Sequence, residues 1–192
     1  VMLAAESLLA LRRMPARTAG VRAAIGGGSA GWGSYYGGSA KGIVICDHAT
    51  VAARSDTGDG AAIGAAGYNG KDTEAEVTIG TAGATAEQED VHVTATAQGG
   101  AAIGNGAKDT KVTIQGHATI QTASTVNFVA IGSEEGDVEV TIKDNAAIDT
   151  EDTAFVGNSS TSSSTIGGVT MYSSADRTVK VTIDGGENGK VE

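Results

Sequence analysis

The feature that most constrains this chain is a short apolar motif that returns five times. Each copy reads Ala-Ala-Ile-Gly or a close variant, and the copies occupy residues 23–26, 61–64, 101–104, 129–132 and 154–157. A second block, Val-Thr-Ile or similar, follows each copy at residues 43–45, 77–79, 112–114, 140–142 and 181–183. A third block follows the first four copies, at residues 48–51, 92–95, 117–120 and 145–148. Three strand-like blocks in one fixed order predict a repeat fold whose unit is a coil with three faces.

The spacing of the first blocks indicates which repeat fold this is. From Ile103 to Ile131 the interval is 131 − 103 = 28 residues, and from Ile131 to Val156 it is 156 − 131 = 25. These lengths fit one turn of a parallel β-helix, whereas the first two intervals, 63 − 25 = 38 and 103 − 63 = 40, require insertions. We therefore expect an all-β fold, a parallel β-helix (β-solenoid) of about five three-strand coils.

The alternation within the second block predicts a column of charges on the outside of the stack. If Val77 and Ile79 point inward, Glu76 points outward, and the equivalent residues of the later coils also point outward. These residues are Glu76, Lys111, Glu139 and Lys180, which alternate in sign. A slip by one coil would place like charges together, so the column favours one register. The glycine that closes each first block is expected at a corner that needs positive φ.

Composition supports a thin-stranded repeat protein and argues against some partners. The chain has 192 residues with 29 Gly, 4% aromatic residues and a net charge of −10. An acidic chain is a poor partner for nucleic acid or an anionic membrane, and no apolar run is long enough to span a bilayer. Cys46 is the single cysteine, so an intrachain disulfide is excluded.

The ends of the chain differ from the repeats. Residues 1–14 have apolar side chains on one side of a predicted helix that ends near Pro15 and Gly20, which would suit a cap over the first coil. We divide the chain into a capping helix and linker at 1–20 and a β-helix domain at 21–192. The sequence stops soon after a strand-like run, so we expect an excerpt of a longer protein.

The glycine-rich blocks resemble the GAGIGGG-type repeats of right-handed parallel β-helix domains in surface proteins of Gram-positive bacteria. The residues at 23–28, 60–64 and 100–104 carry the resemblance, each followed by its Val-Thr-Ile or Ile-Val-Ile triplet. The resemblance extends over roughly residues 21–184, although coils four and five lack the leading glycine. It implies a right-handed coil and an extracellular, cell-surface or cell-wall location, among families that include carbohydrate-binding β-helices similar to polysaccharide lyases.

The aromatic residues gather at one predicted corner. Insertions fall mainly between the first and second blocks, at residues 26–42, 64–76 and 158–178, and they contain every Trp and Tyr of the chain. These candidate ligand-binding residues are Trp32, Tyr35, Tyr36, Tyr68 and Tyr172. Aromatic faces on polar loops suit stacking against sugar rings, and the alternative is that the rings fold down to cover the corner.

Two further groups are candidates for metal binding. His48, His92 and His117 each open a third block, so we expect an outward column of imidazoles. Such a column could share a transition metal or resist joint protonation and make the stack acid-sensitive, and the alternative is a solvated polar ladder.

Acidic residues precede the second block in several coils. Their offsets from the stacked threonine differ, with 78 − 72 = 6 for Asp72 but 113 − 109 = 4 for Asp109, so a calcium site shared by all coils is not expected. A local calcium site near Asp109, Glu134, Glu135 and Asp137 stays open, with a solvated acidic edge as the alternative.

These observations lead to three functional hypotheses. The first is a noncatalytic extracellular module that binds a polysaccharide or host glycan through the aromatic corner, without a cofactor other than a candidate calcium ion. The second is a structural spacer or adhesin stalk that stacks on a neighbouring module or protein partner. A polysaccharide lyase is a remote third, because its groove needs positive charge and the basic residues here are few and scattered.

Overall fold

The structure is a computed structural model of the chain, and it is all-β in the part that it describes. It describes residues 13–18, 23–27, 38–56, 60–66, 73–105, 109–124, 129–133, 136–150, 155–158, 162–166, 169–173, 179–185 and 190–191. Within these residues there are three parallel sheets and one antiparallel hairpin, and no helix. None of the described residues forms a helix long and apolar enough to cross a membrane. The expected all-β fold class is therefore confirmed.

Each parallel sheet collects one kind of block. The first sheet contains β2 (Ile25–Gly26), β5 (Ile63–Ala65), β8 (Ile103–Asn105), β11 (Val129–Ser133) and β14 (Phe155–Asn158). The second sheet contains β3 (Ala40–Ile45), β6 (Ala75–Ile79), β9 (Thr110–Ile114), β12 (Val138–Asp144) and β17 (Val179–Gly185). The third sheet contains β1 (Arg13–Thr18), β4 (Thr50–Ser55), β7 (Val91–Ala97), β10 (Ala118–Ser124), β13 (Ala147–Thr150) and β18 (Lys190–Val191).

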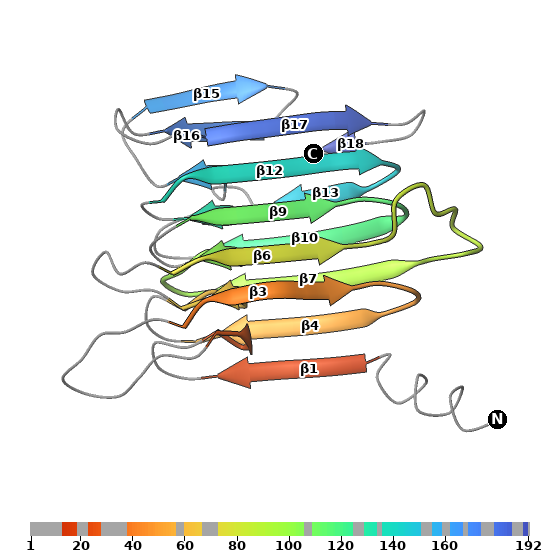
Figure 1. The fold of residues 1–192 in the computed structure, drawn as a ribbon, viewed down its shortest axis with the longest axis horizontal. Helices are drawn as coiled ribbons and strands as arrows, with labels where there is room; N and C mark the ends of the chain where they lie inside the picture. The colour runs from red at the N-terminus through yellow and green to blue at the C-terminus, as the bar shows by residue number, and fades with distance from the viewer. Residues whose placement is uncertain are drawn as a thin grey trace.

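Successive strands visit the three sheets in a fixed rotation. After β2 in the first sheet come β3 in the second and β4 in the third, and the chain then returns to the first sheet with β5. Each strand pairs in parallel with its counterpart from the previous round. Figure 1 shows the second-sheet strands stacked in front and the third-sheet strands running in the opposite direction behind them. This arrangement is compatible with a parallel β-helix.

The first and second blocks align in register as the repeat predicts. In the first sheet, Ile103 has Ile63 and Ile131 as its Cα partners. In the second sheet, the partners of Lys111 are Glu76 and Glu139, and Glu139 also faces Lys180. The alternating charge column is therefore confirmed.

Burial alternates in the second and third sheets but not in the first. Along β6 the valine and isoleucine are buried while Glu76 is exposed, whereas every residue of β5, β8 and β11 is buried. All three sheets contribute columns of apolar side chains to the core, and the isoleucines in them with no solvent exposure are Ile63, Ile103 and Ile131 of the first sheet, Ile79 and Ile114 of the second, and Ile120 of the third. Burial of each such side chain contributes about 1.5–3 kcal/mol, so these columns are the main source of stability.

Glycines of the first sheet let adjacent coils touch. Gly64, Gly104 and Gly132 have φ values of 134°, 134° and 141°. A Cβ built on Gly104 would lie 2.0 Å from the carbonyl oxygen of Gly132. The expected positive φ at these corners is confirmed, and the backbone contact explains why glycine is needed.

The N-terminal prediction needs correction where the structure describes it. Residues 13–18 form β1, which pairs in parallel with β4, so the proposed helix end and linker are wrong there. Pro15 is tolerated because β1 is an edge strand of the third sheet. Residues 1–12, which contain most of the predicted cap, lie outside the described residues.

Among the described residues, two segments outside the three parallel sheets interrupt the coils. The insertion that begins after β14 contains a hairpin of β15 (Ser162–Ile166) and β16 (Val169–Ser173). A second excursion, residues 80–90 between β6 and β7, lies at the corner between the second and third sheets. This excursion, which we call the corner strap, adds a second corner to the single insertion corner that the sequence predicts.

Candidate functional site

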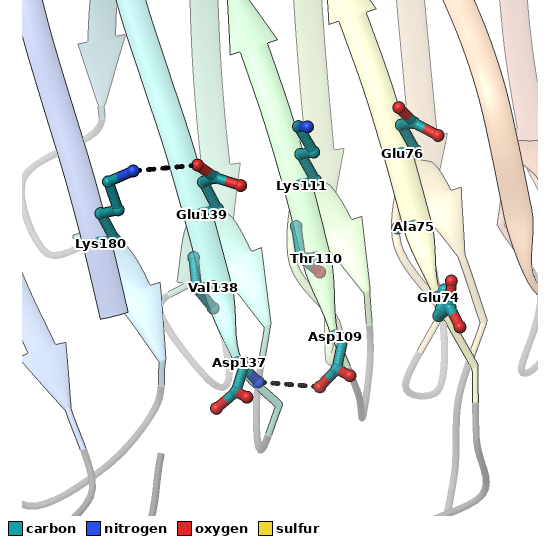
Figure 2. Close-up of a pocket in the computed structure, with 10 residues that line it drawn as sticks. All are labelled: Glu74, Ala75, Glu76, Asp109, Thr110, Lys111, Asp137, Val138, Glu139 and Lys180. Carbon is teal, nitrogen blue, oxygen red and sulfur yellow. Dashed lines mark hydrogen bonds and ion pairs between the residues drawn. The ribbon is translucent and has the colours of Figure 1, made fainter. Parts of the chain in front are cut away.

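A shallow charged groove lies on the outer face of the second sheet (Figure 2). Its volume is about 710 Å³, and strands β6, β9, β12 and β17 supply its lining. The lining residues are Glu74, Ala75, Glu76, Asp109, Thr110, Lys111, Asp137, Val138, Glu139 and Lys180. The groove is thus the outward side of the charge column together with the residues that precede each strand.

One row of the groove consists of carboxylates at the beginnings of the strands. Asp109 accepts a hydrogen bond through Oδ1 from the backbone N–H of Asp137, at 3.0 Å. On the neighbouring strand Glu74 forms an ion pair with Lys41, whose pKa is raised mainly by the hydrogen bond to Glu74. Glu74, Asp109 and Asp137 are all exposed, so this row presents carboxylate oxygens to solvent.

The second row is the alternating charge column. Lys180 Nζ lies 3.2 Å from Glu139 Oε1, while Figure 2 shows Lys111 and Glu76 extended outward along the same row. These side chains are largely exposed, so the ion pair contributes at most about 1 kcal/mol to stability. Their ends are therefore available to other hydrogen-bonding groups.

The two rows determine the chemistry that the groove offers. Five carboxylates and two ammonium groups line it, so its formal charge is 2 − 5 = −3. Carboxylates accept hydrogen bonds from hydroxyl and amino groups, and lysines donate to hydroxyl and carbonyl oxygens. A long, open and polar groove of this kind suits an extended polyhydroxylated chain better than a compact apolar ligand.

The groove lies near the N-terminal ends of the second-sheet strands, and the predicted aromatic insertions precede three of these strands in the sequence. The described chain resumes at Gly38, Thr73 and Val179 after those segments, in each case immediately before or within a second-sheet strand. The candidate residues Trp32, Tyr35, Tyr36 and Tyr68 lie outside the described residues. Tyr172 is in β16, where its backbone pairs with Ser163.

The calcium candidates are brought together only in part. Asp109 and Asp137 are adjacent, and the Asp109 carboxylate accepts a hydrogen bond from the backbone N–H of Asp137, whereas Glu134 and Glu135 lie outside the described residues. Within the part of the chain that the structure describes, no three His, Cys, Asp or Glu side chains are arranged to hold a metal ion.

The predicted column of three histidines is wrong. His92 has Thr50 and Thr119 as Cα partners, so it is two residues further along the strand than the third-block alignment assumed. Asp90 instead lies beside His117, with Oδ1 3.4 Å from Nδ1 of that ring. The other oxygen, Oδ2, is 3.2 Å from Nε2 of His92. A carboxylate therefore separates the imidazoles.

The corner strap is anchored by a buried carboxylate. Glu89 is 1% exposed, and its Oε1 accepts hydrogen bonds from Asp47 N at 3.0 Å and Thr81 Oγ1 at 2.9 Å. Its Oε2 accepts from Thr81 N at 2.6 Å. These three donors offset the cost of removing the carboxylate from water. The strap is thereby joined to the coil before it.

Asp144 fastens the other side of the strap. Its Oδ2 accepts from Gly83 N at 3.0 Å and from Gly116 N at 3.1 Å. The hydrogen bonds from these two backbone groups hold the pKa of Asp144 below its ordinary value. The strap therefore contacts the corner of the preceding coil through Asp47 and, through Asp144, the corner of the coil that lies two further along the stack.

Sequence reasoning missed several of these residues, although one had a readable signal. Glu74 stands 78 − 74 = 4 residues before its stacked threonine, the same offset as Asp109, so Glu74 rather than Asp72 continues the acidic row. Glu89 and Asp144 had no comparable signal, because each accepts a hydrogen bond from a backbone N–H group of a distant corner, Asp47 for Glu89 and Gly83 for Asp144.

Comparison with known proteins finds no matching family model, no similar curated protein and no similar solved structure.

Proposed function

We propose that this chain is a noncatalytic extracellular module, a right-handed parallel β-helix of about five coils, that binds a polysaccharide or glycan. The observation that carries the proposal is the open groove with its two rows of charged side chains. The rows repeat at the spacing of neighbouring strands, roughly 4.8 Å, so a polymer lying across the strands meets a series of carboxylates in the first row and alternating carboxylates and ammonium groups in the second. The predicted aromatic residues of the adjoining insertions would add stacking surfaces at the groove's edge.

The test is binding of the purified chain to a panel of neutral, anionic and amino-group-bearing polysaccharides by isothermal titration calorimetry. We expect saturable binding that is weakened at least tenfold by Lys111→Met with Glu139→Gln, and also by Trp32→Ala with Tyr68→Ala. Glu87→Gln is the matched control, because Glu87 is an exposed carboxylate on the corner strap, at the opposite end of the second-sheet strands. Absence of binding to every polysaccharide would contradict the proposal.

A structural spacer or adhesin stalk is the second candidate. It is favoured by the strict register of the charge column, in which each coil specifies the position of the next. A folded chain that binds no glycan but whose coils are held in register by these charges would favour the spacer.

A further inference from the structure

The corner where the strap enters β7 brings two histidines from successive coils to one carboxylate. Asp90 contacts His92 on its own strand and His117 on the next coil, at 3.2 and 3.4 Å. In the preceding coil, Asp47 O accepts a backbone hydrogen bond from Asp90 N, and Ala49 O accepts one from His92 N. His48 stands between these two acceptors in the sequence. Imidazoles from two successive coils therefore contact one carboxylate at the end of the strap.

We propose that Asp90, His92 and His117 form a pH-responsive latch that holds the corner strap more firmly at mildly acidic than at alkaline pH. An imidazole ordinarily gains its proton between about pH 8 and pH 5. Each histidine then forms a charge-assisted pair with Asp90, and the pair with His117 joins the strap to the following coil.

The position of His117 supports a latch that is firmer at mildly acidic pH. Its Nδ1 is shielded from solvent and has no hydrogen-bond partner among the described residues. Asp90 Oδ1 lies close to this nitrogen and can accept a hydrogen bond when Nδ1 is protonated. The proton on Nδ1 is held most firmly when the ring is an imidazolium, because donor and acceptor then carry opposite charges.

The other carboxylates near Asp90 act in the same direction. Glu89 precedes it, with its carboxylate bonded to Thr81 and to the backbone of Asp47. The corner of the preceding coil contributes the exposed Asp47 and the partly buried His48. Protonated histidines therefore enter a corner that already holds three carboxylates, which relieves repulsion among them.

Titration of the Asp90 carboxyl sets the lower limit of the pH range in which the latch is closed. Desolvation raises the pKa of Asp90, but the hydrogen bond to His92 and the close approach and charges of both imidazoles outweigh it and lower that pKa below the ordinary value. A carboxyl with a lowered folded pKa stabilises the fold above its unfolded pKa and loses that contribution as the pH falls through the folded value. The latch is thus closed in mildly acidic solution, above the titration of Asp90 and in the range where an imidazole ordinarily carries its proton.

Hydrogen exchange of the strap amides tests the proposal. For the wild-type chain we expect protection, corrected for intrinsic exchange rates, to be about two- to tenfold higher near pH 5.5 than near pH 8, the range that two exposed ion pairs supply. Asp90→Asn and, independently, His117→Gln should each reduce this pH response, while Glu87→Gln should retain it. Amides of β9 and β10 report whether each variant is folded.

Two results would overturn the latch. One is wild-type protection that is equal at both pH values or lower in acid, as repelling imidazoles would produce. The other is a folded Asp90→Asn variant that keeps the full pH response.

Discussion

Substitution of Gly104 by alanine, compared with the same substitution at Gly42, tests the two reasons why glycine is needed in the first sheet. The first reason is backbone conformation, because a φ of 134° places a Cβ in a strained position that costs about 1–2 kcal/mol. The second is contact, because the new Cβ would lie 2.0 Å from the carbonyl oxygen of Gly132 and the coils would have to separate. Overpacking of this kind typically costs about 1–3 kcal/mol. The expected loss for Gly104→Ala is therefore about 2–5 kcal/mol.

Gly42→Ala is the matched control. Gly42 also has a positive φ, 75°, but a Cβ built there has no atom within 4 Å. The loss of unfolding free energy in Gly42→Ala should stay at about 1–2 kcal/mol, because only the backbone conformation is strained. Urea unfolding followed by circular dichroism measures both variants through the shift in midpoint at unchanged slope. Equal losses in the two variants would refute the claim that coil contact, rather than φ, makes Gly104 indispensable.

Four other variants test the core, the charge column and the strap. Ile103→Ala should lower the free energy of unfolding by about 2–5 kcal/mol, whereas Val44→Ala, at a site that is 62% exposed, should change it by under about 0.5 kcal/mol; similar losses in both would contradict the assigned core. Glu139→Lys should cost about 0.5–1 kcal/mol at low salt by placing like charges beside Lys180, with much of the loss recovered in 1 M salt, and a salt-independent loss would exclude a charge effect. Asp144→Asn should cost about 1 kcal/mol near neutral pH by replacing charge-assisted bonds with neutral ones. Because the folded pKa of Asp144 is lowered, the wild-type advantage should be present above the ordinary aspartate pKa and disappear as the pH falls through the folded value; an advantage that persists at pH 2 would show that the charge is not responsible.

The sequence allowed the first and second blocks to be aligned because each has a distinctive residue at a fixed place. The glycine after Ile103 and the charged residue before Val112 mark the register within each strand, and the structure confirms both alignments. The third block lacks such a mark. His92 was aligned two residues out of place, and a shift of two preserves the alternation of inward and outward side chains, so the periodicity could not reveal the error.

Two other differences have distinct physical origins. The strand at residues 13–18 was predicted as helix and linker, although Met-Pro-Ala-Arg-Thr matches Val-Ala-Ala-Arg-Ser of β4, because Pro15 suggested a break rather than an edge strand. The corner strap has no strand periodicity, and its anchors Glu89 and Asp144 act on backbone groups. Such bonds leave no pattern of residue types in the sequence.

The corner strap changes how the coils depend on one another. In an ordinary repeat stack each unit contacts only its immediate neighbours, so stability is a sum of local terms and the ends can fray independently. The bond from Gly83 to Asp144 couples residues 144 − 83 = 61 positions apart, across two coils. Loosening of the coil that contains Asp144 therefore also releases the strap of an earlier coil. The central coils should consequently unfold as one cooperative block, whereas coils outside the reach of the strap unfold at lower denaturant concentration.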